Sequence, residues 1–297
     1  MAKTAARLPH LGVIGLGHVG SAVARRLLDA RYPLSVFDSV PLRAEPLAAD
    51  AAVCDSPAAL ASAADVILMR LPSSEAFVEA IEQQLLPGLT KGKTVIDLGV
   101  TDVLETRRLA EWLQARDVCF LDAPVSGGAA AAREGRLSIF AGGRKDAYKR
   151  CLPLFKALAA LGNIVYCGEA GSGQVVKGVE QLALGLSAAA CLEALAYGAS
   201  FGFSAASLCE ALQQTPLSRA GFEQFTQTLL REGGEAVSTN YAELPHVLAA
   251  GERQGQRLPL AQALLEFLRH APPSVIERGR HIPSLWVELK RKPQTGP

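Results

Sequence analysis

Leu11 to Gly20 reads LGVIGLGHVG, an apolar run that leads directly into a Gly-x-Gly-x-x-Gly pattern. The run Leu11–Gly15 predicts a buried strand, and the pattern from Val19 to Ala30 predicts a helix directly after it. In that context the first glycine permits a tight turn, the second lets the backbone approach a pyrophosphate, and the third lets the helix pack on the sheet. The stretch therefore predicts a nucleotide-binding turn, with an ordinary strand-turn-helix corner as the alternative.

Residues at the carboxyl ends of the expected strands are the candidate contacts of a dinucleotide. Asp38 ends the expected strand Leu34–Asp38, where a carboxylate accepts hydrogen bonds from ribose hydroxyls and repels a 2′-phosphate. This predicts NAD, although the nearby Arg43 keeps NADP open, and a turn cap is the alternative role of Asp38. Arg70 also ends a strand, with a surface position as its alternative. The candidate cofactor residues are Gly15, Leu16, Gly17, His18, Val19, Gly20, Asp38, Ser39, Leu71, Pro72 and Gly99.

The chain changes character near Glu169. Before it, apolar runs alternate with helical stretches, which predicts a parallel sheet covered by helices on both faces. After it, helical patterns predominate, and the first runs from Gln174 to Gly202. We therefore predict an α/β fold with a Rossmann-type, doubly wound domain over residues 1–168 and an all-helical domain over residues 169–297. The expected strands also include Val66–Leu71, Val95–Leu98, Val118–Leu121, Leu137–Phe140 and Ile164–Tyr166. The later expected helices are Ala205–Gln213, Gly221–Leu230, Tyr241–Gln254 and Leu260–Arg269.

Composition excludes several classes of protein. Thirty basic residues stand against 29 acidic ones in 297 residues, so no electrostatic footprint for nucleic acid is expected. The six cysteines form no Cys-x-x-Cys pair, which disfavours metal and disulfide frameworks and suits a reducing cytoplasm. No apolar signal stretch precedes the first strand. The segment Leu182–Cys209 is apolar almost throughout, but Glu193 in its middle favours a buried helix over a membrane span.

Two further motifs contain candidate catalytic residues. Ser126-Gly127-Gly128 offers backbone N–H donors beside a hydroxyl, an arrangement that suits a carboxylate, although a plain loop is equally consistent. Lys177 lies about one turn inside the expected long helix among apolar neighbours, where desolvation would favour a general base. Gln181 lies one turn further on the same face. A solvent-facing lysine is the alternative from spacing alone.

These motifs carry a family resemblance. GLGHVGSAVARRL, DAPVSGGAAAAREGRLSIFAGG and GSGQVVK resemble the cofactor, substrate and lysine motifs of the 3-hydroxyisobutyrate or β-hydroxyacid dehydrogenase family, relatives of 6-phosphogluconate dehydrogenase. The resemblance covers nearly the whole chain. It implies a Rossmann-type domain, a long interdomain helix and a helical second domain, assembled as a homodimer or homotetramer. It assigns Ser126, Gly127 and Gly128 to the substrate carboxylate and Lys177 to proton transfer.

The chain departs from the family pattern at several positions. Gln181 stands where the family usually has Asn, Gly99-Val100 stands for a Ser-Thr pair, and Ala242 stands for a lysine. Gln keeps the amide with one more methylene, whereas the other changes remove polar groups. We therefore expect a more apolar pocket and an unusual substrate rather than a different reaction. Leu184 stands where decarboxylating relatives have Glu, which argues against decarboxylation of 6-phosphogluconate.

Four functions are compatible with these observations. The first hypothesis is an NAD-dependent dehydrogenase of a small 3-hydroxy acid with Lys177 as general acid and base and no metal. The second is an NADPH-dependent reductase of small aldehydes of the glyoxylate or succinic semialdehyde type. The third is a catalytically silent dinucleotide-binding module, motivated by the departures above. The fourth is an imine reductase, a related family that generally lacks a lysine at position 177. In each case we expect a cytoplasmic protein without nucleic-acid or membrane partners.

Overall fold

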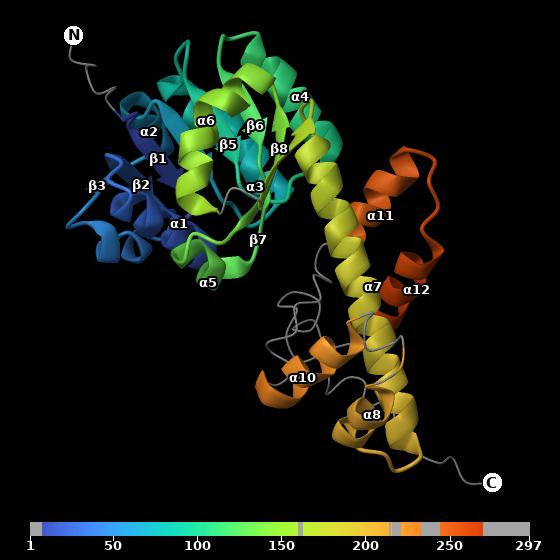
Figure 1. The fold of residues 1–297 in the computed structure, drawn as a ribbon. Coiled ribbons are helices and arrows are strands. Elements are labelled where there is room, and N and C mark those ends of the chain that lie inside the picture. Colours follow the sequence, from blue (N-terminus) through green and yellow to red (C-terminus); the bar gives the residue numbers. More distant parts are fainter. Residues whose placement is uncertain (1–7, 160–162, 214, 216–220, 233–243, 270–297) are drawn as a thin grey trace. The chain divides into compact units, whose positions relative to one another are not determined.

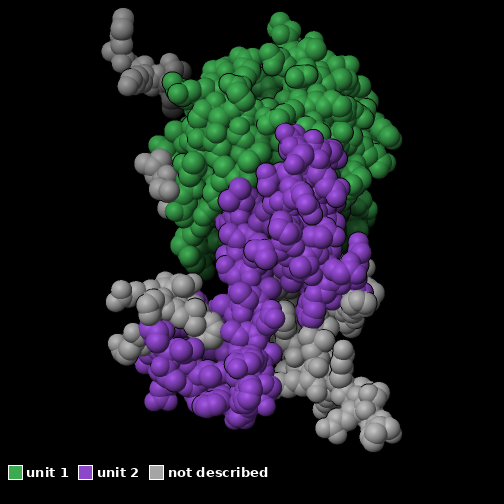
Figure 2. Space-filling view, turned by 90° about the vertical axis from the view of Figure 1, so that its right-hand side faces the viewer, with its two compact units in different colours: residues 1–177 green, residues 178–297 purple. Residues whose placement is uncertain are grey.

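The computed structural model describes residues 8–159, 163–213, 215, 221–232 and 244–269. The chain divides into two compact units, residues 1–177 and residues 178–297 (Figure 2). Unit 1 contains the sheet, and the described part of unit 2 consists of helices and their connections (Figure 1). The fold class is thus the predicted one. The domain boundary between residues 168 and 169 stays a prediction.

Unit 1 is built on one nine-stranded sheet with the order β3-β2-β1-β4-β5-β6-β8-β7, and β9 pairs with β8. β1 lies between β2 and β4. After β1 the chain adds β2 and β3 on one side of it and then crosses to the other side, where it adds β4. In open α/β sheets ligands bind at this switch point, at the carboxyl ends of the strands. The strands are β1 (Leu11–Ile14), β2 (Leu34–Phe37), β3 (Ala52–Val53), β4 (Val66–Met69), β5 (Thr94–Asp97), β6 (Cys119–Asp122), β7 (Val125–Ser126), β8 (Ser138–Gly143) and β9 (Ile164–Gly168).

The prediction of a parallel sheet is wrong for one part of it. β8 runs antiparallel to β6 and to β7, and the parallel direction resumes between β8 and β9. The connection between β7 and β8, residues 127–137, contains the short helix α5 (Gly128–Arg133). A parallel return requires a crossover of about a dozen residues or more, so this connection reverses the chain instead. An apolar run in the sequence carries no information on strand direction.

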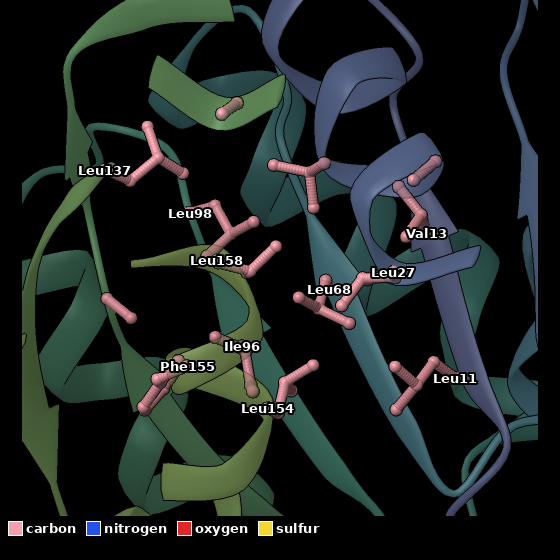
Figure 3. Close-up of a cluster of buried hydrophobic side chains, with 14 of the residues drawn as sticks. Leu11, Val13, Leu27, Leu68, Ile96, Leu98, Leu137, Leu154, Phe155 and Leu158 are labelled. Atoms are coloured by element: carbon pink, nitrogen blue, oxygen red, sulfur yellow. The ribbon is translucent and has the colours of Figure 1, made fainter. Parts of the chain in front are cut away.

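Helices cover both faces of the sheet, and this explains the near-continuous apolar strands. Val13 and Leu68 belong to a core with Leu27 of α1 and Phe155 of α6 (Figure 3). Their neighbours in the strands, such as Ile14, belong to a second core built from α2, α3 and α4. The helices of unit 1 are α1 (His18–Asp29), α2 (Pro57–Ala63), α3 (Ser74–Glu79) with a π-helical extension (Ala80–Leu85), α4 (Val103–Gln114), α5 and α6 (Lys145–Leu158).

The long helix α7 (Ser172–Ser200) begins in unit 1 and continues through unit 2. In unit 2 its residues Ala189 and Leu192 form a small core with residues of α11 and α12. By length and composition α7 could cross a membrane, although core helices of soluble proteins meet the same criteria, and 28% of its most apolar window is buried. The long helix, which the sequence predicted to be buried, is therefore only partly buried within this chain. The other helices among the described residues are α8 (Ala205–Leu212), α10 (Phe222–Glu232), α11 (Leu244–Arg253) and α12 (Pro259–Leu268).

Candidate functional site

The turn between β1 and α1 requires its first and third glycines for steric reasons. Gly15 has φ 89°, and a Cβ there would lie 2.3 Å from the Arg70 carbonyl oxygen. A Cβ at Gly20 would lie 1.8 Å from the Gly15 carbonyl oxygen, so no side chain fits between helix and turn. Gly17, the N-cap residue of α1, has no side chain that could cap the helix. The first N–H groups of the helix are therefore left for an anion, which the helix dipole also favours.

A cavity of about 540 Å³ opens at the carboxyl ends of β1, β2 and β4. A Cβ at Gly17 would meet nothing within 4 Å, so the backbone itself forms part of the cavity wall. Leu16 and Gly99 do not line this cavity, whereas Arg43, Arg70 and residues of α3 such as Glu79 do. No periodicity in the sequence indicated the contribution of α3. Of the predicted cofactor residues, the cavity brings together Gly15, Gly17, His18, Val19, Gly20, Asp38, Ser39, Leu71 and Pro72.

Asp38 connects the end of β2 to the glycine turn. Its side chain is almost fully buried, and Oδ2 accepts a hydrogen bond of 2.6 Å from the Leu16 N–H. Oδ1 accepts from the Val40 N–H at 2.8 Å and from Arg43 Nη1 at 3.3 Å. The carboxylate therefore caps the following turn and also lines the cavity. The two roles considered for Asp38 from the sequence are compatible.

Lys177 lies buried beside the glycine pair that follows β7. The side chain is 6% exposed, and its Nζ donates a hydrogen bond to Ser126 Oγ. Gly127 and Gly128 have φ values of 114° and 67°, a backbone conformation that L side chains rarely adopt. Gly127, the N-cap residue of α5, has no side chain that could cap that helix. A buried amine, a hydroxyl and uncapped backbone N–H groups thus lie together, which suits binding of a carboxylate next to a proton acceptor.

Two buried aspartates hold the start of α7, a feature that the sequence analysis missed. Asp122 Oδ1 accepts from the Gly171 N–H at 2.9 Å, and Oδ2 accepts from the Gln174 N–H at 3.0 Å. Asp97, paired with Asp122 across β5 and β6, accepts from Gln174 Nε2 at 3.1 Å. Gln174 Nε2 also donates to the Gly99 carbonyl oxygen. Because Lys177 follows Gln174 by three residues, these contacts set the position of its helical turn.

The carboxyl groups of Asp97 and Asp122 should give the stability of the protein an unusual pH dependence. Burial, the largest cause, raises the pKa of Asp97 to about 6 and that of Asp122 to about 7. The folded protein then holds protons that the unfolded chain has released, so stability decreases as pH rises from about 4 to about 7. We expect Asp97→Asn and Asp122→Asn to flatten this slope in urea unfolding measured at several pH values.

Asp146→Asn is the matched control for this experiment. Arg144 and Arg150 hold the pKa of the exposed Asp146 carboxyl below its usual range. Its contribution is lost only as pH falls through that lowered pKa, so the slope above pH 4 should not change. An unchanged slope in both Asp97→Asn and Asp122→Asn would contradict the buried titration.

The remaining candidates are only partly described. Gln181 lies one turn beyond Lys177 in α7, in unit 2; it is 6% exposed, and its Oε1 has no hydrogen-bond partner among the described residues. Ala242, Tyr241 and the first seven residues lie outside the part that the structure describes. Within that part, no group of three His, Cys, Asp or Glu residues is arranged to hold a metal ion, and all six cysteines are free thiols.

Comparison with known proteins gives consistent matches. A family model described as the NAD binding domain of 6-phosphogluconate dehydrogenase matches residues 10–168. The mitochondrial 3-hydroxyisobutyrate dehydrogenase of Bos taurus is 34% identical over 208 residues, which cover 69% of this chain and 61% of that protein. The NAD-dependent L-serine dehydrogenase of Pseudomonas aeruginosa is 34% identical over 212 residues, 70% of each chain. The chain thus spans only about 61% of the length of the mitochondrial relatives.

The likeness of fold extends over nearly the whole chain. A solved structure of 3-hydroxyisobutyrate dehydrogenase from Mycobacterium tuberculosis with L-serine matches with a TM-score of 0.80. The match covers 96% of this chain and 100% of that one, at 22% sequence identity. At that identity the match shows a shared fold and nothing further about the site.

Proposed function

This chain belongs to the β-hydroxyacid dehydrogenase family, and we propose that it transfers a hydride between NAD and a small 3-hydroxy acid. The observation that carries the proposal is the buried Lys177 amine, which donates a hydrogen bond to Ser126 beside the Gly127-Gly128 turn. A general base and a carboxylate-binding backbone are the two groups that oxidation of a hydroxy acid requires from the protein. Lys177 and the Gly127-Gly128 turn, which we propose for these two roles, both lie in unit 1.

The glycine turn fits a dinucleotide. The N-cap residue of α1 is Gly17, which has no side chain to cap the helix and leaves the wall of the cavity open, and Asp38 stands at the end of β2. The diphosphate would bind at the first turn of α1, and the adenosine ribose at Asp38. Bound there, the cofactor supplies the hydride acceptor or donor.

Lys177 handles the proton of the substrate hydroxyl. In its neutral form the amine donates one N–H to Ser126 Oγ and keeps its lone pair for that proton. In the reverse direction the ammonium returns the proton to the carbonyl oxygen. The backbone N–H groups of Gly127 and Gly128 hold the substrate carboxylate, and the Gln181 amide orients the substrate. Burial excludes water from the amine, which strengthens each of these interactions.

The choice between NAD and NADP depends on the charges of Asp38 and Arg43. The Asp38 carboxylate is buried and would repel a 2′-phosphate, which favours NAD. Arg43 lies 3.3 Å from Asp38, and its half-exposed guanidinium would attract a 2′-phosphate. This contact is the observation that favours the second candidate function, an NADPH-dependent reductase of small aldehydes. The carboxylate is the more buried of the two charges, so we propose NAD.

The test is absorbance at 340 nm with a panel of 3-hydroxy acids at about pH 9, first with NAD and then with NADP. We expect reduction of NAD with at least one acid, and faster turnover with apolar side groups than with serine or glycerate. Rapid oxidation of NADPH by glyoxylate or succinic semialdehyde would instead support the reductase. No change in absorbance with either panel would favour the third hypothesis, a dinucleotide-binding module without catalytic activity.

The remaining predictions about the whole protein are proposals of the same kind. The exposed apolar residues of α7 and the family relationship support a homodimer or homotetramer. A cytoplasmic location without membrane or nucleic-acid partners stays a prediction. The buried lysine argues against an imine reductase, because that family generally lacks a lysine at this position.

A further inference from the structure

Arg70 follows β4 directly and lies against the glycine turn. Its N–H donates to the Ile14 carbonyl oxygen at 2.9 Å, and its own carbonyl oxygen is the atom that excludes a side chain at Gly15. Its Cβ would be 3.8 Å from a Cβ at Gly20. The base of this arginine is therefore held by the same turn that presents the N-terminus of α1 to the cavity.

The guanidinium extends from there toward the end of β5. Nη1 donates to the Leu71 carbonyl oxygen at 2.9 Å and lies 3.7 Å from the position of a Cβ at Gly99. Because Gly99 has no side chain, this space is open to the arginine. Asp97 is near enough for Arg70 to lower the pKa of its carboxyl, although burial outweighs this effect. Arg70 thus lies between the phosphate-binding turn and the carboxyl end of β5.

Among the described residues, no carboxylate is in hydrogen-bond contact with the Arg70 guanidinium. Among the described residues its only hydrogen bond is the one to Leu71, which uses one of the five N–H donors of a guanidinium. Arg43, which also lines the cavity, is paired with Asp38. Ser126, Gly127, Gly128 and Lys177, which we assign to the substrate, do not line this cavity. An anion bound beside Arg70 therefore belongs to the dinucleotide rather than to the hydroxy acid.

We propose that Arg70 binds the diphosphate of the dinucleotide, as a side-chain cation added to the N–H groups of α1. This assignment rests on the proposed function. A helix N-terminus offers about half an elementary charge, whereas a diphosphate carries two negative charges. A partly desolvated guanidinium forms charge-assisted, bidentate hydrogen bonds with phosphate oxygens. Arg70 therefore raises affinity for any ligand with that diphosphate, with or without a nicotinamide.

The experiment measures binding of NADH and of ADP-ribose to the full chain by calorimetry, without substrate. ADP-ribose keeps the diphosphate and lacks the nicotinamide. We expect Arg70→Met to weaken both ligands by about tenfold, with Arg70→Lys in between, and the difference to shrink at high salt. Arg116→Met is the matched control: Arg116 packs over the ring of Trp112 and does not line the cavity, so this variant should bind like the original chain.

Three results would overturn the assignment. Equal affinity of Arg70→Met and the original chain for NADH and ADP-ribose would show that Arg70 does not bind the diphosphate. A raised KM for the hydroxy acid in Arg70→Met, with unchanged affinity for NADH and ADP-ribose, would show that Arg70 binds the substrate instead. Recovery of affinity in the double variant Arg70→Met/Asp97→Asn would mean that Arg70 only balances the buried Asp97 carboxyl. If the original chain itself bound neither NADH nor ADP-ribose, the proposed function would fail first, which is a distinct outcome.

Discussion

Lys177→Ala will lower kcat for oxidation of the hydroxy acid by about a thousandfold, the middle of the range for loss of a positioned general base. Affinity for NADH should stay within about twofold, because Lys177 does not line the cavity at the glycine turn. The two effects separate a proton-handling role from a structural one. Turnover is followed at 340 nm, and cofactor binding is measured by calorimetry on the same preparations.

Two further variants sharpen this result. Lys177→Arg keeps the positive charge and the hydrogen-bond donor but has no accessible neutral form, so it should be as inactive as Lys177→Ala. Lys91→Ala removes an exposed lysine paired with Asp117 and should retain full activity. Substantial turnover in Lys177→Ala, or recovery in Lys177→Arg, would show that the amine is not the proton acceptor.

Asp122→Ala should destabilise unit 1 by about 3 kcal/mol, because the Gly171 and Gln174 N–H groups would lose their buried acceptor at about 1–3 kcal/mol each. The removed carboxyl is itself disfavoured by burial, which offsets part of this loss. The melting temperature should fall by about 9 °C, at about 2–4 °C per kcal/mol for a domain of this size. Calorimetric melting at pH 6 measures the change.

The control variants follow from the geometry. Asp122→Asn keeps one carbonyl oxygen for two donors and should lose about half as much stability. Asp117→Ala removes an exposed carboxylate whose ion pair with Lys91 lies at the surface, and surface pairs contribute about 1 kcal/mol or less. A melting temperature for Asp122→Ala equal to that of Asp117→Ala would mean that the start of α7 finds other acceptors.

The local parts of this protein could be predicted from its sequence. β1, the glycine turn and α1 follow from residues within twenty positions of one another, since strand, turn and helix preferences are short-range. The apolar strands likewise predicted a sheet covered on both faces, and the cores on the two faces agree with that. Lys177 and Ser126 were candidates because of their local sequence, the resemblance assigned their roles, and spacing alone favoured a solvent-facing lysine.

Other features depended on contacts between distant segments. The capping of α7 by Asp122 and the link from Gln174 to Asp97 join residues about 50 to 80 positions apart, and the antiparallel pairing of β8 with β6 joins residues about 20 positions apart. Arg70 had a surface position as its alternative because nothing in its neighbourhood in sequence shows that Gly99 leaves room for the guanidinium. Local preference and apolar pattern therefore determined which elements form and where the nucleotide turn lies. Only the tertiary structure decided which buried charges meet, because burial and pairing of a charge depend on the chain segments that pack around it.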